Sequence, residues 1–389
     1  MFTSLLVGRR SPPDSVQLIA EADALKRLVD RLAHEPRVAL DTEAASFHRY
    51  IDRVYLIQLS SDRETALIDP LALEDLAPLG QLLSDPRTEI VLHDADYDLR
   101  ILNRDYGFTA QSLFDTRVAA QLAGEPAVGL GALLDKYFGI KVNKKLQRAD
   151  WSRRPLTPDM VEYAAADTRY LPALRDKLES RLEQDGRLDW AREEFGILEG
   201  IRWLQPTDTA AAYLRIKGAK SLSRRSLAVL RELFQWREST ARDLDRAPFR
   251  VLGNAALIAV AKSAPRSLNR LKSVTGVPSS AVARYGADLV QAVRRGSEVP
   301  QSELPIVKRP LRPEHDQAYD RRLEALKRLR DRRAKEVGMD PGMLCPNGTL
   351  QAVARAASTT EKQLSFIAEL RRWQATVLGR DQILAAIKG

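Results

Sequence analysis

Two acidic residues near the start of the chain have the spacing of a cation site. Asp41 and Glu43 follow an apolar run, Val38 to Leu40, that predicts a β-strand. Residues two apart on a strand point to the same face. At an effective dielectric near 20, two unit charges about 4 Å apart repel by roughly 4 kcal/mol, and bound cations reverse that cost. The pair is therefore a candidate cation site, although a lone Asp-x-Glu is also common on solvated surfaces.

A second candidate group stands on a predicted helix. Tyr163 and Asp167 are four residues apart, so a phenol and a carboxylate stack on one helix face. The alanines at 164–166 keep the helix narrow where it would approach a strand. The alternative is an amphipathic helix with a packed Tyr and an exposed Asp. Asp98, after the predicted strand Ile90 to Leu92 and a turn-like segment, is a third candidate carboxylate.

The elements that would position these side chains form an α/β pattern. Apolar and β-branched runs predict strands, and helical spacing with capping signals predicts helices between and after them. Thr157 and Pro158 open the last helix as cap and first-turn proline. We expect a layered α/β fold with a mixed sheet. The predicted strands are Val38–Leu40, Val54–Leu59, Thr65–Ile68 and Ile90–Leu92, and the predicted helices are Leu73–Leu83, Val118–Leu122 and Met160–Leu178.

The second half of the chain is predicted to be all-helical. A Pro-containing stretch from Trp203 to Thr209 ends the first unit, and Leu222 to Arg295 forms a compact helical unit. Four prolines make Gly296 to Pro313 a semi-rigid linker. A final helical unit covers Tyr319 to Gly389, and because both units open with an Arg-rich helix we treat them as degenerate copies of one module.

Charge divides the chain in the same place. Residues 1–205 hold 27 Lys and Arg against 34 Asp and Glu, a formal charge of −7, and residues 206–389 hold 34 against 18, a charge of +16. A basic half is typical of nucleic-acid binding, although both imbalances could also be solvated surface. The single Cys345, the lack of a signal peptide and the lack of an apolar run of membrane length indicate a cytoplasmic protein with no membrane partner.

The order of the motifs resembles the DEDD exonuclease superfamily, in the tyrosine-type branch that includes ribonuclease D. The matching residues are Asp41-Thr-Glu43, Val91-Leu-His93 with Asp98-Leu99, Phe114-Asp115-Thr116, Leu146-Gln147-x-x-Asp150-Trp151, and Tyr163-x-x-x-Asp167. The unit from Leu222 to Arg295 resembles the HRDC module shared by certain helicases and ribonuclease D, and the terminal unit resembles a more diverged HRDC copy. The resemblance covers nearly the whole chain.

The resemblance implies a fold, a cofactor and a set of site residues. It implies an RNase H-like α/β exonuclease domain over residues 1–205, all-α HRDC-type helical domains at 214–296 and 319–389, and a Pro-rich linker at 297–318. It implies that Asp41, Glu43, Asp98 and Asp167 hold two divalent cations, Mg²⁺ or Mn²⁺, and that Tyr163 positions the attacking water. Asp98 is chosen over Asp94 and Asp96 because its spacing from His93 matches the family. His93 and Asp115 are expected to be structural, with Thr116 capping the following helix.

Substrate-binding residues are predicted from the basic segment before the Tyr163 helix. Lys144, Lys145, Gln147 and Arg154 would draw a phosphate backbone toward the metals, and Trp151 would stack on a base or pack in the core. Arginines on the first HRDC helix would enlarge the footprint.

The function implied is a metal-dependent 3′–5′ exoribonuclease acting on tRNA precursors or other structured RNA 3′ ends, as a monomer and without a nucleotide cofactor. Two alternatives stay open: a DNA 3′–5′ exonuclease, and a catalytically silent RNA-binding protein. The segment at 217–221 lacks the phosphate-loop pattern, which argues against an ATP-driven helicase. Removal of residues 300–389 is expected to reduce processivity and to leave cleavage of short substrates intact.

Overall fold

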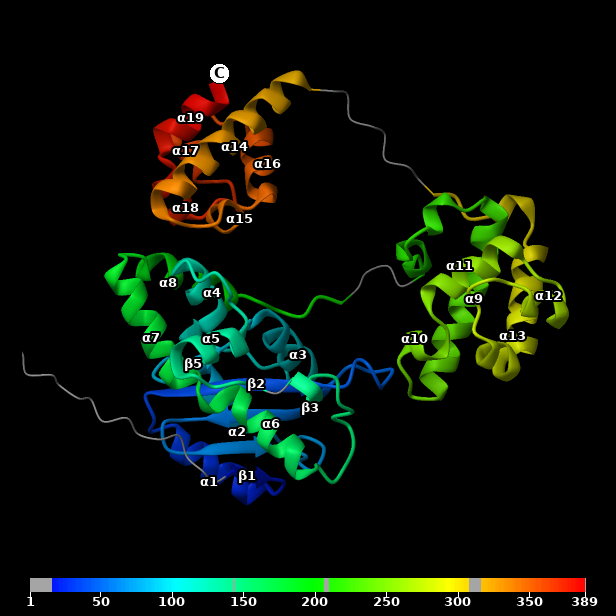
Figure 1. The fold of residues 1–389 in the computed structure, drawn as a ribbon, viewed down its shortest axis with the longest axis horizontal. Helices are drawn as coiled ribbons and strands as arrows, with labels where there is room; N and C mark the ends of the chain where they lie inside the picture. The colour runs from blue at the N-terminus through cyan, green and yellow to red at the C-terminus, as the bar shows by residue number, and fades with distance from the viewer. Residues whose placement is uncertain (1–15, 143, 206–209, 308–315, 389) are drawn as a thin grey trace, which may run out of the picture.

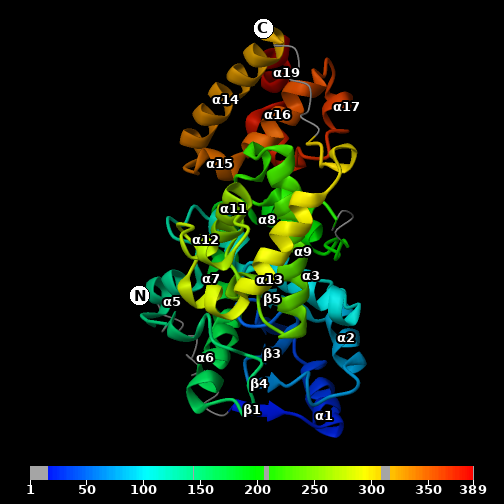
Figure 2. The same cartoon turned by 90° about the vertical axis from the view of Figure 1, so that its right-hand side faces the viewer.

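The chain folds into an α/β domain and two helical domains (Figure 1). The computed structural model describes residues 16–142, 144–205, 210–307 and 316–388. The N-terminal domain runs from β1 to α8, the first helical domain from α9 to α13, and the second helical domain from α14 to α19. The second helical domain lies above the N-terminal domain and the first lies to its side (Figures 1 and 2).

The N-terminal domain contains a six-stranded mixed sheet, as the sequence predicts. The strand order is β1-β4-β3-β2-β5-β6, antiparallel between β2 and β3 and between β3 and β4, and parallel at the other pairs. The four predicted strands are present, and β2 extends beyond the predicted run to include both Asp41 and Glu43. Two short edge strands, β1 and β6, were not predicted. The strands are β1 (Val16–Ile19), β2 (Arg37–Ala44), β3 (Val54–Ser60), β4 (Thr65–Ile68), β5 (Glu89–Leu92) and β6 (Leu113–Asp115).

Three predictions about the helices of this domain differ from the structure, and the helices Ala22–Leu32, Leu130–Phe138 and Leu188–Leu198 were not predicted. The helix predicted from Leu73 begins only at Ala77. The helix predicted from Met160 to Leu178 is two helices, because Pro172 lacks the amide hydrogen that a continuous helix needs. Asp115, not Thr116, caps the helix that follows it. The helices are α1 (Ala22–Leu32), α2 (Ala77–Ser84), α3 (Asp96–Tyr106), α4 (Thr116–Leu122), α5 (Leu130–Phe138), α6 (Pro158–Arg169), α7 (Leu171–Gln184) and α8 (Leu188–Leu198).

The two helical domains repeat one arrangement of hydrogen bonds. Arg237 of α9 donates to the Leu252 carbonyl at 3.3 Å and to Asn254 Oδ1 at 2.7 Å. Ninety-three positions later, Arg330 of α14 donates to the Cys345 carbonyl at 3.3 Å and to Asn347 Oδ1 at 2.8 Å. The helices are α9 (Arg224–Asp243), α10 (Pro248–Val251), α11 (Asn254–Ser263), α12 (Leu268–Lys272), α13 (Ser279–Glu298), and α14 (Gln317–Val337), α15 (Pro341–Leu344), α16 (Asn347–Ala356), α17 (Glu361–Leu364), α18 (Arg372–Leu378) and α19 (Arg380–Lys388). The same hydrogen bonds at the same spacing indicate that the two helical domains are copies of one module.

The second helical domain shares an apolar core with the N-terminal domain. Buried side chains from α14 to α19 belong to the same contiguous cluster as those of the sheet, whereas the first helical domain has a separate cluster. Trp373 of α18 stacks on Trp190 of α8 with ring centroids 5.1 Å apart, and its indole N–H donates to Glu194 at 2.8 Å. Glu193 accepts the backbone N–H groups of Arg372 and Trp373 at 2.7 and 3.0 Å. This domain therefore packs against the N-terminal domain through a shared core. The expectation that removal of residues 300–389 leaves cleavage of short substrates intact stays a prediction.

No helix within the described ranges combines the length and the apolar character that a bilayer span requires. The cytoplasmic location expected from the sequence stays a prediction.

Candidate active site

Strand β2 directs Asp41 and Glu43 to the face of the sheet that α6 covers. Asp41 pairs with Gln58 of β3 and Glu43 pairs with Leu56, so all four side chains project from one face. On this face the Ser60 hydroxyl lies 2.8 Å from the hydroxyl of Thr168 on α6. The predicted pair of carboxylates is therefore enclosed between the sheet and a helix.

Helix α6 approaches the sheet closely because small residues line its inner face. Ala164 and Ala165 are fully buried, and Thr157 caps the helix through the Met160 N–H as predicted. This close approach brings Tyr163 and Asp167 over the end of β2. The Tyr163 ring rests on the Trp151 ring, with centroids 5.9 Å apart.

The third element, α3, follows β5, the parallel neighbour of β2, and brings Asp98 to the same place. Asp115 fixes the start of this helix by accepting the backbone N–H groups of Asp94 and Ala95 at 3.2 and 2.8 Å. The Thr42 hydroxyl donates to Asp98 Oδ1 and so joins β2 to α3. His93 pairs with Thr116 at 2.9 Å, and burial lowers its pKa to about 4, so it is neutral. Asp115 and His93 therefore have structural contacts, as expected.

The electrostatics of the four carboxylates show that they converge. Burial, followed by the charge of Asp167, raises the pKa of Asp41 to about 8, and burial raises the pKa of Asp167 to about 7. The pKa values of Glu43 and Asp98 are raised well above their usual range, first by burial and then by the charge of Asp41. Burial and then the neighbouring carboxylates raise the pKa of Tyr163, so its phenol is protonated at neutral pH. Each negative charge opposes the others in this site.

The donor set suits hard divalent cations. Carboxylate oxygens are the ligands that Mg²⁺ and Mn²⁺ prefer, and a cation would relieve the mutual repulsion that raises these pKa values. Within the described ranges, no three His, Cys, Asp or Glu side chains are already gathered around one point at metal-ligand distances. The fit therefore rests on the chemistry and convergence of the four carboxylates.

Gln58 is a site feature that the sequence did not reveal. It is fully buried directly opposite Asp41, and among the residues that the structure describes neither its amide oxygen nor its amide nitrogen has a hydrogen-bond partner. An unsatisfied buried amide costs about 1–3 kcal/mol, so its retention requires a reason. A signal was present, because Gln58 is the one amide within the apolar run Val54–Leu59.

A cavity of about 180 Å³ opens beside Glu43. The aromatic side chains of Phe47 and Tyr97 line it and are 42% and 46% exposed. Gln147, a predicted substrate residue, lines the same cavity, as does Arg148. Phe47 and Tyr97 were missed because no spacing rule links a residue after β2 with one on α3.

The other predicted substrate residues have different surroundings. Trp151 is fully buried, so it packs in the core and is not open to a base. The Arg154 guanidinium is occupied by Asp69 and by the carbonyls of Tyr55, Trp151 and Arg153, which corrects its expected role as a phosphate ligand. Lys145 is exposed on a short 3₁₀ turn, and the side chain of Lys144 lies outside the described part.

Arginines on the first helix of the first helical domain are also engaged within that domain. Arg224 donates to the Leu304 carbonyl at 2.9 Å and Arg225 to the Ser297 carbonyl at 3.0 Å, while Arg237 is buried. These side chains stabilise the domain, so they cannot all supply the RNA contacts expected of them.

Comparisons with known proteins agree with this geometry. Residues 16–183 match a 3′–5′ exonuclease family, and residues 226–293 and 320–387 each match the HRDC domain. The fold and site therefore define a 3′–5′ exonuclease with two HRDC domains.

Individual relatives identify the family within this class of exonucleases. Ribonuclease D of Desulfotalea psychrophila is 32% identical over 354 residues, covering 90% of this chain and 94% of the relative. Ribonuclease D of Escherichia coli is 34% identical over 290 residues, covering 74% of this chain and 77% of the relative. The chain belongs to the ribonuclease D family.

Solved structures extend the similarity to the domain arrangement. The crystal structure of E. coli RNase D matches with a TM-score of 0.69 and 29% identity, covering 96% of this chain and 99% of that one. A protein from Bifidobacterium adolescentis matches with a TM-score of 0.81 and 25% identity, covering 96% and 97%. The similarity to this second structure therefore extends over all three domains of the chain.

Proposed function

We propose that this chain removes nucleotides hydrolytically from the 3′ ends of structured RNA, with Asp41, Glu43, Asp98 and Asp167 as the metal-binding residues. The observation that carries the proposal is the convergence of these four carboxylates, of which Asp98 is buried and the other three are half-buried, beside Tyr163 in a member of the ribonuclease D family. We also propose the domain boundaries expected from the sequence, with the adjustment that α13 continues to Glu298.

The four carboxylates would hold two divalent cations, Mg²⁺ or Mn²⁺. Such ions supply stabilisation of the attacking and leaving oxygens in phosphodiester hydrolysis. The residues contribute the negative charge and the rigid placement: β2 fixes Asp41 and Glu43, α6 fixes Asp167, and Asp115 fixes the start of the helix that carries Asp98.

Tyr163 would orient the attacking water by hydrogen bonding. Its raised pKa keeps the phenol protonated at neutral pH, so it can donate or accept a hydrogen bond but cannot act as a base. Trp151 supports the ring from below, and this contact explains why the tryptophan is buried.

The cavity beside Glu43 would receive the terminal nucleotide. Phe47 and Tyr97 offer exposed aromatic faces, and stacking on aromatic rings accepts every base. Gln147 adds an amide that can hydrogen-bond a base or sugar. The pocket therefore suits removal of nucleotides without sequence preference.

RNA precursors such as those of tRNA are the proposed substrates. The E. coli relative is described as an exoribonuclease involved in structured RNA processing, and the +16 half of this chain favours a polyanionic partner. Lys144 and Lys145 are proposed as phosphate contacts on the approach to the site.

Digestion of a 5′-labelled single-stranded RNA with Mg²⁺ or Mn²⁺ tests the proposal. We expect a ladder that shortens from the 3′ end in the wild type and is lost in Asp167→Asn. Asp159→Asn, in the exposed first turn of the same helix, is the matched control and should keep the wild-type rate.

Two results would overturn the proposal. A matched DNA strand degraded faster than RNA would favour the DNA exonuclease. RNA that is bound but not cut with either metal would favour a silent binding protein.

A further inference from the structure

The turn that joins α9 to α10 in the first helical domain lies against the loop that follows β2. In this turn Asp245 accepts the Tyr50 backbone N–H at 3.2 Å and pairs with Arg49 at 3.1 Å. The Phe249 ring meets the Phe47 ring edge to face, with centroids 6.0 Å apart. The contact thus joins two domains that do not share a core.

Most of these contacts are hydrogen bonds to the main chain of the loop at residues 47–50. The Ala247 N–H donates to the His48 carbonyl at 3.3 Å, and the Arg250 guanidinium donates to the Phe47 carbonyl. Together with the Asp245 contact to Tyr50, they restrain three of the four residues from 47 to 50. A loop held by its main chain at successive positions has little freedom to move its side chains.

The other side of the same loop forms the cavity beside Glu43. Residues 42–47 supply one wall, and Phe47 stands at its rim, with the Arg148 guanidinium 5.1 Å from its ring centroid. Phe47 is therefore held between the N-terminal domain and Phe249 of the first helical domain. Phe47, the last residue of the cavity wall, is one residue from the contact at His48 and three residues from the contact at Tyr50.

We infer that Asp245, Phe249 and Arg250 of the first helical domain are positioning residues for the terminal-nucleotide pocket, acting through Phe47. The inference rests on the proposed function and deepens it. The domain then contributes to each round of cleavage through the pocket, independently of any RNA that its own surface binds. Its effect should extend to substrates too short to reach that surface.

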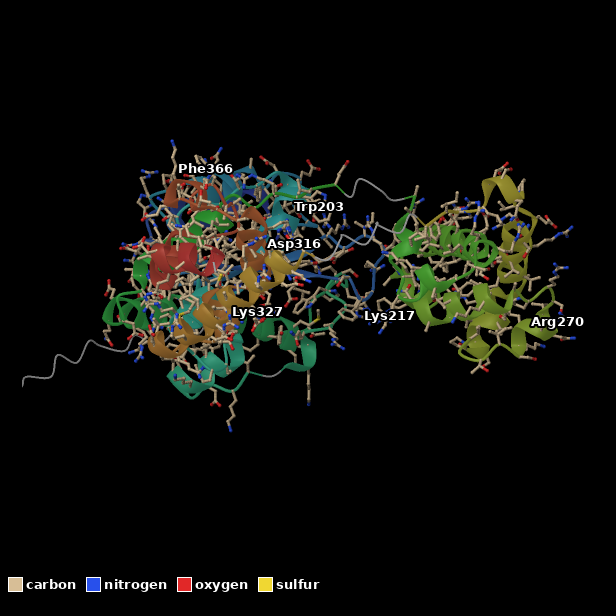
Figure 3. All side chains as sticks on the ribbon, turned by 90° about the horizontal axis from the view of Figure 1, so that it is seen from above. Trp203, Lys217, Arg270, Asp316, Lys327 and Phe366 are labelled. Atoms are coloured by element: carbon tan, nitrogen blue, oxygen red, sulfur yellow. The ribbon has the colours of Figure 1, made fainter. Side chains whose placement is uncertain are left out.

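The test compares a tri-ribonucleotide with a long structured RNA, using the full chain and Mn²⁺. Phe249→Ala removes a ring that is 52% exposed, so the domain should fold normally. Asp245→Gly removes the carboxylate at a residue whose φ of +44° glycine adopts readily. Arg270→Ala is the matched control, because Arg270 is exposed on α12 at the far end of the same domain (Figure 3).

We expect KM for the trinucleotide to rise about two- to tenfold in Phe249→Ala, the range that an aromatic pair contributes, with a smaller change in kcat. Asp245→Gly should raise KM in the same direction, and Arg270→Ala should leave it unchanged. A general loss of folded protein would instead lower kcat at constant KM. Melting temperature, measured in parallel, identifies that case, and it would count against the inference.

Two outcomes separate the inference from the proposed function. Wild-type cleavage of both RNAs, with the variants weakened only on the long RNA, would overturn the inference, because the domain would then act only as a binding surface. A wild type that cleaves neither RNA would overturn the proposed function and the inference with it.

Discussion

Arg154 connects the segment before α6 to the sheet, and its replacement by alanine should destabilise the N-terminal domain. Its guanidinium donates to Asp69 at 2.5 and 2.8 Å, to the Tyr55 carbonyl at 2.6 Å and to the Trp151 carbonyl at 2.8 Å. The Asp69 side chain is 9% exposed and that of Arg154 is 26% exposed. Arg154→Ala would leave a buried carboxylate without its cation, and would leave the carbonyls of Tyr55, Trp151 and Arg153 without this donor.

The size of the effect follows from burial. Removing one partner of a fully buried ion pair costs about 3–5 kcal/mol, and partial access of water to Arg154 reduces this to about 2–3 kcal/mol. A domain of this size loses roughly 2–4 °C of melting temperature for each kcal/mol, so we expect a drop of about 4–12 °C.

Calorimetry of the full chain measures this drop in the transition that unfolds the N-terminal domain. Arg153→Ala is the matched control, because the neighbouring side chain is 78% exposed and its ion pair with Asp150 spans 3.4 Å. Exposed pairs contribute at most about 1 kcal/mol, so the control should melt within a few degrees of the wild type.

Acid should reduce the difference between wild type and Arg154→Ala. Burial opposes ionisation of Asp69, but the Arg154 hydrogen bond and the Leu71 N–H outweigh it, so the pKa of Asp69 is lowered. The stabilisation is therefore complete above the unfolded pKa near 3.9 and is lost as pH falls through the folded pKa. Urea unfolding from about pH 6 down to about pH 3 should show the gap in stability narrowing.

One pattern of results would refute this account of Arg154. An unchanged melting temperature together with weaker RNA binding and a shallower salt dependence would restore the phosphate-binding role that the sequence indicated.

Three further predictions concern other parts of the molecule. Gln58→Met should raise the free energy of unfolding by about 1–3 kcal/mol, because it removes two unsatisfied polar atoms, and should lower the cleavage rate; unchanged stability in urea would show that the amide has a partner. Trp373→Ala should cost about 3–5 kcal/mol and separate the second helical domain from α8, measured by calorimetry against Arg372→Ala, whose side chain is 89% exposed. If about six phosphates are neutralised, RNA affinity should fall on the order of a thousandfold between 50 and 200 mM salt, and a flat response in filter binding would argue against the basic half as the RNA-binding surface.

The carboxylates could be found from the sequence because their signals are local. Asp41 and Glu43 share a strand, and Tyr163 and Asp167 share a helix turn, so spacing alone places each pair on one face. The order of the motifs then links the two pairs. The strands β2 to β5 were also predictable, because their apolar runs are bounded by breakers.

The remaining features depend on partners distant in the sequence. The sequence around Arg154 predicts a phosphate ligand, but in the structure Arg154 pairs with Asp69, which lies 85 residues earlier in the chain. Phe47 and Tyr97 line one cavity only because α3 begins beside the end of β2. The contact between Trp190 and Trp373 spans two domains, and neither residue carries a local signal of it.

Incubation with linear and circular RNA of the same sequence tests the central claim most directly. With Mn²⁺, the wild type should convert the linear RNA to mononucleotides and leave the circle intact, because the circle has no 3′ end, and Asp167→Asn should cut neither. A circle that is opened by the wild type, or a linear RNA that Asp167→Asn degrades at the wild-type rate, would contradict a 3′-end exonuclease centred on these carboxylates.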